Sequence, residues 1–147
     1  MTARSFAVIA SGAFMKEMVS WANALYSEGV DNKDADAFAA AFTEEAWLRF
    51  ANNEPIVGRD NIREAIAGFF TMFASLSHEP IGTTWSDGTL VLEANVTYTL
   101  HKGGTVTVPA CTIFRMSEQG GGKPLARRCQ IYVDLSPLFA AVQAESA

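Results

Sequence analysis

Apolar residues in the first half of the chain recur every three or four positions, a spacing that predicts amphipathic helices. The first helix is expected from about Gly12 to Glu28, with Gly29 as its stop. Asp34 is a suitable N-cap for a second helix. The apolar faces of these two helices would consist of Met15, Met18, Val19, Ala22, Leu25 and Tyr26, and of Ala35, Phe38, Ala41 and Phe42.

The middle of the chain combines a short strand with a third helix. The strand is expected at Trp47–Ala51 and is followed by a turn through residues 52–55. Asp60 is then a suitable cap for a helix over Ile62–Leu76. This segment is rich in Phe and Met, as expected of a helix that covers a cavity.

From His78 onward apolar residues recur at every second position, which is the spacing of β-strands, and four strands are expected there. The clearest is Val91–Leu100, where apolar and polar residues alternate between the two faces. The segments 101–105 and 117–123 are typical of hairpin turns. Helices followed by an antiparallel meander indicate an α+β fold, with the helices on one face of the sheet.

Length and composition favour one globular domain that does not bind nucleic acid. The chain has 147 residues, of which 49% are hydrophobic and 18% charged, so it can form a core. Its net charge is −5, which disfavours a phosphate-backbone partner. The one adjacent basic pair, Arg127 and Arg128, is interpreted as two outward-facing residues of a strand.

The cysteines and the longest apolar runs indicate neither a metal site nor a membrane span. Cys111 and Cys129 have no His or Cys partners at zinc-ligand spacing, and buried reduced thiols are favoured over a disulfide. No apolar run approaches the roughly 20 residues of a spanning helix. We therefore expect a cytoplasmic protein that uses no metal ion and no cofactor.

Several segments in fixed order resemble one known superfamily. They are Trp21–Tyr26, Asp34–Phe50, Pro55–Ile62, Trp85–Val91, Val108–Arg115 and Ile131–Leu138. Together they resemble the SnoaL-like branch of the nuclear-transport-factor-2-like superfamily, over about residues 15–140. The resemblance implies that residues 1–147 form a single domain. It also implies a curved antiparallel sheet that forms a cone-shaped half-barrel, covered by three N-terminal helices and enclosing a pocket.

Three of the family chemistries depend on acidic residues that this chain does not have. In the resemblance to ketosteroid isomerases, Tyr26 occupies the position of the catalytic tyrosine, but Phe50 and Thr112 occupy those of the two carboxyl groups. Limonene epoxide hydrolases and polyketide cyclases have an acidic residue on the last strand, where this chain has Ile131. Strand 106–116 also has no acidic residue. The isomerase and epoxide hydrolase mechanisms are not expected here, whereas Ile131 weakens the resemblance to a cyclase without removing a cyclase-like lyase from the candidates.

The resemblance to scytalone dehydratase suggests a different set of residues. It involves Asp31, next to the Lys-Asp pair after the first helix, and His78 after the third. A tyrosine together with a His–Asp pair could supply both the base and the acid that a dehydration needs. The second pocket histidine of that family has no counterpart on strand 106–116, and strand alternation places His101 on the solvent side.

Two functions remain open. The first is a cofactor-independent acid/base enzyme, a lyase or isomerase, acting on a small hydrophobic and cyclic oxygenated molecule. The alternative is a non-catalytic module of the same fold that binds a small molecule or dimerises. In either case the family resemblance implies a homodimer formed through the outer sheet face, where Cys111, Ile113 and Tyr132 could make contacts.

The candidate residues each have a structural alternative. The catalytic candidates are Tyr26, His78, Asp31 and Asp134. Tyr26 could instead be a core tyrosine, His78 a residue of the helix–strand junction, and Asp134 the residue that holds the C-terminal turn. The candidates for ligand contacts are Trp47, Phe50, Asn52, Phe69, Phe73, Tyr98, Thr112, Phe114 and Ile131, most of which could equally be core residues.

Overall fold

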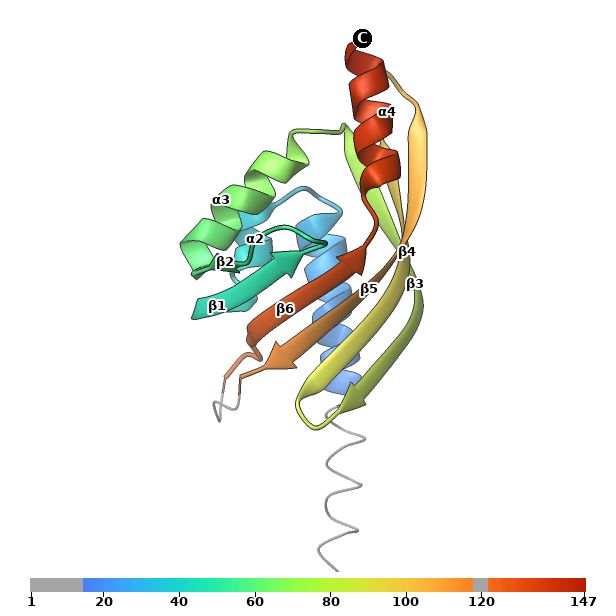
Figure 1. The fold of residues 1–147 in the computed structure, drawn as a ribbon. Helices are drawn as coiled ribbons and strands as arrows, with labels where there is room; N and C mark the ends of the chain where they lie inside the picture. Colours follow the sequence, from blue (N-terminus) through green and yellow to red (C-terminus); the bar gives the residue numbers. More distant parts are fainter. Residues whose placement is uncertain (1–14, 118–121) are drawn as a thin grey trace, which may run out of the picture.

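A curved six-stranded sheet with the order β2-β1-β6-β5-β4-β3 forms the centre of the fold (Figure 1). The computed structural model describes residues 15–117 and 122–147. The strands are β1 (Phe42–Phe50), β2 (Ile56–Val57), β3 (Ser75–Ser86), β4 (Thr89–Thr99), β5 (Thr105–Met116) and β6 (Ala126–Val133). Neighbouring strands are antiparallel except β1 and β6, which pair in parallel. The sheet does not close, because β2 and β3 remain its edges.

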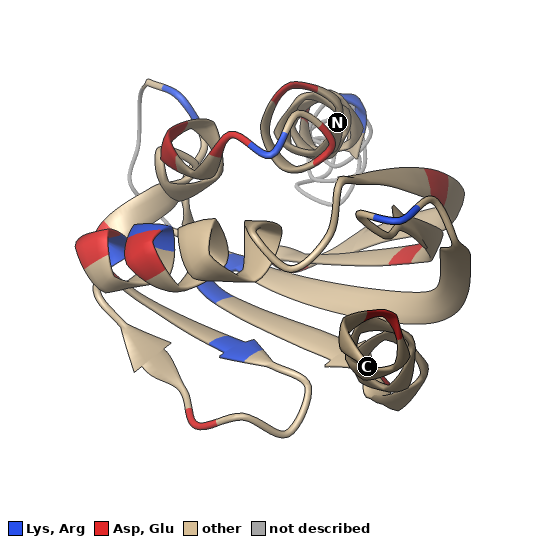
Figure 2. Cartoon of the chain, turned by 90° about the horizontal axis from the view of Figure 1, so that it is seen from above, with Lys and Arg blue, Asp and Glu red and all other residues tan. Residues whose placement is uncertain are grey.

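Most of the described helices lie on one face of this sheet, and the last one lies on the other face. Residues 15–24 are α-helical and continue directly into a π-helical turn, η1 (Leu25–Val30). This first helix, α2 (Ala35–Ala39) and α3 (Arg59–Phe70) lie over the inner face, while α4 (Ser136–Ser146) lies on the opposite side (Figure 2). The α+β fold with N-terminal helices over a curved sheet is confirmed. The C-terminal helix α4 is an addition that the sequence analysis did not predict.

The strand pattern agrees closely with the predicted alternation. On β4 the side chains of Leu92, Ala94, Val96 and Tyr98 are buried against the helices, whereas Glu93 is exposed. Residues 101–104 form the predicted turn between β4 and β5. The second predicted turn includes residues 118–121, which lie outside the described residues, as do residues 12–14 of the predicted first helix.

Both predicted boundaries of the third helix are wrong. The third helix ends at Phe70, and Leu76 is already a buried residue of β3, because the chain there alternates between buried and exposed positions. The cap of α3 is Gly58, whose φ of 99° is favoured only for glycine. Asp60 lies in the first turn without a capping bond, where its charge suits the helix dipole. Strand β1 also begins earlier than predicted, at Phe42.

Asp34 lies at the connection between the first helix and α2, where it was predicted to cap α2. The Asp34 side chain accepts a hydrogen bond from the Ala37 backbone N–H at 3.0 Å, which confirms Asp34 as the cap of α2. Gly29 does not stop the first helix, since η1 continues to Val30. It lies where α2 approaches closely, because a Cβ atom on Gly29 would be 3.4 Å from the backbone nitrogen of Phe38.

The core lies between the inner sheet face and the first three helices. Its largest fully buried side chains include Phe42, Leu48, Ile62, Phe73 and Phe114. Phe114 of β5 packs edge-on against Trp21 of the first helix, with ring centres 5.1 Å apart. This packing holds the first helix across the concave face of the sheet and leaves a cavity beside it.

No helix among the described residues is long and apolar enough to cross a membrane.

Candidate functional site

A small aromatic cavity lies between the inner face of the sheet and the ends of the helices. Its volume is about 50 Å³, which is below the roughly 300–1,000 Å³ of ordinary ligand pockets. Six of the predicted ligand-contact residues line it: Phe50, Phe69, Tyr98, Thr112, Phe114 and Ile131. The cavity wall is therefore mostly apolar, with a few polar groups contributed by the first helix and strands β3 to β5.

The most specific polar contact at this cavity joins Asp31 and His78. Nδ1 of His78 lies 2.7 Å from Oδ1 of Asp31. The backbone N–H of His78 also donates to Oδ2 of the same carboxylate, at 3.2 Å. The His78 side chain is 12% exposed and that of Asp31 is 24% exposed, so the pair is partly shielded from water. Asp31 thus contacts both the backbone and the ring of His78 and fixes the ring orientation.

Tyr26 completes a three-residue cluster on the same side of the cavity. Its ring centre lies 4.4 Å from that of His78, with the rings tilted by 42°. Burial raises the pKa of the Tyr26 phenol well above its ordinary value, and a hydrogen bond with Thr112 offsets only part of this effect. Tyr26 therefore keeps its proton at neutral pH and can act as a hydrogen-bond donor.

The π-helical turn explains how Tyr26 and Asp31 reach the same histidine. They are five positions apart, and in an α-helix of 3.6 residues per turn this separation would place them about 140° apart around the axis. In the wider turn of η1 the Asp31 N–H instead bonds to the Tyr26 carbonyl at 2.8 Å. The two side chains consequently leave the helix on one side, toward β3.

Asp134, the remaining catalytic candidate, lies apart from this cluster. It is exposed, does not line the cavity, and accepts hydrogen bonds from the backbone N–H and the hydroxyl of Ser136, at 2.9 and 2.7 Å. These bonds lower the pKa of its carboxyl group. The structure thus places Asp134 at the turn that begins α4.

Three of the predicted ligand contacts also lie away from the cavity. Trp47 points to the outer sheet face, where the Arg128 guanidinium stacks at 3.7 Å from the ring centre. Asn52 is exposed in a separate surface hollow beside Tyr132. Phe73 is fully buried behind the cavity wall, with its ring centre 4.9 Å from that of Tyr98.

Cys129 is a cavity residue that the sequence analysis treated only as a buried thiol. It lies on β6 two positions before Ile131, so strand alternation alone could have assigned it to the same face. Burial raises the pKa of its thiol far above the ordinary value, which leaves it protonated and unreactive at neutral pH. Among the described residues no group of three or more His, Cys, Asp or Glu side chains could hold a metal ion.

A family profile described as the SnoaL-like domain matches residues 22–123, which is more than half of the chain. The chain belongs to the SnoaL-like domain family. The matched region includes Tyr26, Asp31, His78 and all strands from β1 to β5. No curated protein sequence matches the chain.

Solved structures of SnoaL-like and related proteins share the fold at low sequence identity. A protein from Jannaschia sp. CCS1 assigned to the SnoaL-like polyketide cyclases is 19% identical, with a TM-score of 0.73 over 88% of this chain and 94% of that one. TerC, co-crystallised with polyporic acid, is 14% identical, with a TM-score of 0.70 over 86% and 98%. An LEH-like epoxide hydrolase from M. tuberculosis is 12% identical, with a TM-score of 0.68 over 88% of this chain and 92% of that one. These similarities show the fold of this SnoaL-like protein, and its own residues must indicate the activity.

The buried protonated groups at the cavity predict a loss of stability in alkali. Burial raises the pKa of Tyr26 and Tyr98 above 10.0 and that of Cys129 above 9.0. Above these values the unfolded chain loses protons that the folded chain keeps, so the free energy of unfolding decreases as the pH rises. Below pH 9 this stabilisation is fully present. Each group that ionises only on unfolding lowers the stability by about 1.4 kcal/mol per pH unit.

Urea unfolding at a series of pH values up to about 11 measures this effect. Tyr98→Phe removes one of the ionising groups with little change in shape and is expected to reduce the slope. An equal slope in the wild type and in this variant would contradict the assignment.

Proposed function

We propose that this SnoaL-like protein is a cofactor-independent acid/base enzyme, a lyase or isomerase acting on a small hydrophobic and cyclic oxygenated molecule. The observation that supports this most strongly is the convergence of Asp31, His78 and Tyr26 at one side of an aromatic cavity. A histidine held by a carboxylate, next to a phenol that keeps its proton, supplies a base and a hydrogen-bond donor within one site.

His78 is the proposed base. With Asp31 accepting from Nδ1–H, the neutral ring has its lone pair on Nε2, and this nitrogen takes a proton from a carbon next to a carbonyl group. The two electrons of the C–H bond move toward the carbonyl oxygen and form an enolate. The positive charge that develops on the imidazole is stabilised by the Asp31 carboxylate.

Tyr26 is the proposed donor to the substrate oxygen. Its phenol O–H, which burial keeps protonated, donates a hydrogen bond to the oxygen on which negative charge accumulates. In an isomerisation, His78 returns the proton to a different carbon. In a dehydration, the proton goes instead to the hydroxyl on the neighbouring carbon, which leaves as water.

The cavity wall supports an apolar cyclic ligand as the substrate. Phe50, Phe69 and Phe114 present aromatic surface, and the described residues of the lining include no Lys, Arg, Asp or Glu. Because the free volume is only about 50 Å³, a ring-sized ligand must displace wall side chains. Phe69 is only partly buried and is a suitable candidate for such a movement.

The alternative is a module that binds an apolar molecule without turnover. It is favoured by the apolar or neutral side chains of Phe50, Thr112 and Ile131, which line the cavity at positions where related enzymes have acids. TerC, which has a similar fold and was co-crystallised with polyporic acid, supports a small organic molecule as the ligand.

Deuterium exchange on a simple cyclic ketone separates the two functions. β-Tetralone in D₂O carries exchangeable C–H bonds next to its carbonyl group, and NMR measures both its binding to the protein and its rate of exchange. The enzyme proposal predicts that the protein accelerates exchange above the rate in buffer. Binding without acceleration would support the binding module instead.

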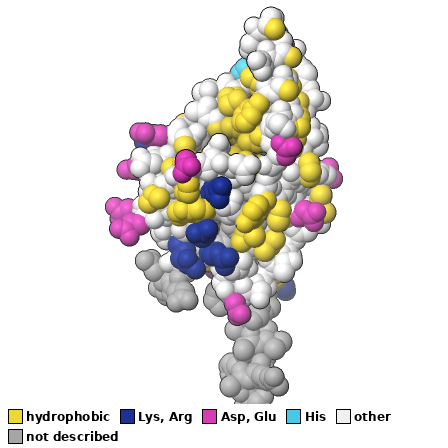
Figure 3. Space-filling view, viewed as in Figure 1, with side chains coloured by type: hydrophobic (Ala, Val, Ile, Leu, Met, Phe, Trp, Pro, Cys, Tyr) yellow, Lys and Arg dark blue, Asp and Glu magenta, His cyan; other side chains and the backbone are white. Residues whose placement is uncertain are grey.

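We also propose that the protein forms a homodimer through the outer face of the sheet. Cys111 and Ile113 of β5 and Tyr132 of β6 lie on that face, and Tyr132 is 57% exposed. Viewed as in Figure 1, this face carries apolar side chains beside a group of basic ones (Figure 3). Exposed aromatic and aliphatic side chains in one area are typical of an interaction surface.

Tyr132→Asp is therefore expected to convert the dimer to a monomer, because it places a charge in the apolar contact. Light scattering coupled to size-exclusion chromatography measures the mass directly. Ile81→Asp is the matched control, since Ile81 is 53% exposed but lies on the edge strand β3. A wild type that is monomeric at all concentrations, or a dimer insensitive to Tyr132→Asp, would contradict this interface.

A further inference from the structure

The first helix ends in a motif whose usual glycine position is occupied by Lys33. The Asp34 N–H bonds to the Gly29 carbonyl and the Lys33 N–H to the Val30 carbonyl, both at 2.9 Å. These are the two bonds of a Schellman motif, in which the residue corresponding to Lys33 has a left-handed backbone. Lys33 has a φ of 55°, a conformation that favours glycine and is disfavoured for a lysine. The backbone conformation alone therefore does not explain a lysine at this position.

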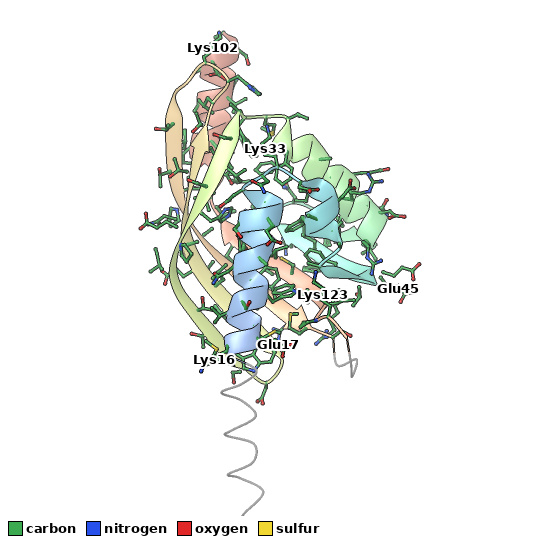
Figure 4. The ribbon with its side chains drawn as sticks, turned by 180° about the vertical axis from the view of Figure 1, so that it is seen from behind. Lys16, Glu17, Lys33, Glu45, Lys102 and Lys123 are labelled. Atoms are coloured by element: carbon green, nitrogen blue, oxygen red, sulfur yellow. The ribbon has the colours of Figure 1, made fainter. Side chains whose placement is uncertain are left out.

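The Lys33 side chain extends to the segment that precedes β3. Its Nζ donates to the carbonyls of Phe73 and Ala74, at 2.8 and 3.2 Å, and lies 5.6 Å from the centre of the Phe73 ring. Figure 4 shows Lys33 at the end of the first helix. A glycine at this position would relieve the backbone but would leave both carbonyls without this donor.

These contacts link the two segments that carry the site. Asp31 lies two positions before Lys33, and His78 lies four positions after Ala74. Among the described strands β3 pairs only with β4, so this pairing does not by itself fix β3 relative to the first helix. Lys33 supplies a charged donor at the point where the chain leaves α3 and enters β3.

We infer that Lys33 is a positioning residue, which fixes β3 relative to the first helix and thereby holds His78 against Asp31 and Tyr26. This inference rests on the proposed site, but it concerns the geometry of that site and not its turnover. Lys33 does not line the cavity, so it acts only through the backbone carbonyls before β3.

The Nδ1–H proton of His78 reports this geometry directly. When Nδ1–H donates to Asp31, the proton is shielded from water and its NMR resonance is observed as a slowly exchanging signal. The chain has only two histidines, so ¹⁵N labelling of histidine resolves them, and His78→Gln identifies the signal. The readout requires no substrate.

Lys33→Gly and Lys33→Met are expected to accelerate exchange of this proton by about tenfold or more, the effect of removing a charged hydrogen-bond donor. Lys33→Gly also relieves the left-handed backbone, so its thermal midpoint should stay within about 5 °C of the wild type. Lys33→Met keeps the left-handed backbone and the apolar stem and loses only the donor, which provides the readout even if the glycine variant is unstable.

Lys102→Met is the matched control. Lys102 also donates through Nζ to a backbone carbonyl, that of Glu145, but this bond joins the β4–β5 turn to α4 and involves neither the first helix nor β3 (Figure 4). The His78 signal should be unchanged in this variant. Unchanged exchange in both Lys33 variants, or an equal acceleration in Lys102→Met, would overturn the role of Lys33.

The same experiment separates this inference from the proposed function. A wild type without the slowly exchanging signal would reject the Asp31–His78 pair, and with it both proposals. If the signal is present and sensitive to Lys33 but no ketone is turned over, the positioning role stands and the enzyme proposal fails.

Discussion

Replacement of His78 by glutamine is expected to slow deuterium exchange on β-tetralone by about 10²–10⁴-fold, the usual contribution of a general base. Glutamine approximates the size of the imidazole and can still donate to Asp31, so the cavity wall should persist. It has no nitrogen lone pair that accepts a proton, and this step is therefore lost. Binding of the ketone should change little, because the aromatic wall is unaltered.

His101→Gln is the matched control for this prediction. His101 is exposed, contacts the Thr71 carbonyl at 2.9 Å, and does not line the cavity. Its replacement should leave the exchange rate unchanged, whereas Tyr26→Phe should lower it, since the donor to the enolate oxygen is lost. Equal rates in the wild type and His78→Gln would exclude His78 as the base.

Phe114→Ala is expected to lower the free energy of unfolding by about 3–5 kcal/mol, as is typical of a buried phenylalanine. Phe114 has no exposed surface, packs against Trp21, and forms part of the cavity wall. Its removal therefore enlarges a space that already exists and deprives the first helix of its aromatic partner. Urea unfolding measures the loss, and a ring-sized apolar ligand should restore part of it by filling the space.

Ile81→Ala provides the comparison for this large effect. Ile81 is 53% exposed on the edge strand, and its truncation should cost less than about 0.5 kcal/mol. A similar loss in both variants would show that Phe114 has no special role in connecting the helix to the sheet.

The fold could be predicted where one periodicity dominates, as on β4. The prediction failed between α3 and β3, because Phe69, Phe70, Phe73 and Leu76 continue the helical spacing of apolar residues beyond the end of α3. Their assignment depends on pairing with β4, which local sequence does not encode. The early start of β1 has the same cause, since Phe42 pairs with Ala126 of the distant strand β6.

Residues of the candidate site could be predicted where the chemistry of a side chain and the family resemblance indicated the same position. Tyr26, Asp31 and His78 were identified in this way and lie together. Trp47 and Phe50 are both predicted to contact the ligand. They are three positions apart on one strand, so their side chains point to opposite faces of the sheet and only one of them can line the cavity. The π-helical turn had no signal in the hydrophobic spacing, so the common orientation of Tyr26 and Asp31 could only come from the structure.

The parallel pairing of β1 with β6 has a consequence for the order in which this molecule forms. Phe50 and Ile131 are partners across these two strands and both line the cavity, yet they come from opposite halves of the chain. Contacts between such distant segments form late, because a long loop must close first. During synthesis the first helix, α2, α3 and the β3–β4 hairpin can assemble while the cavity is still open on one side. Its wall is complete only after the last strand has left the ribosome.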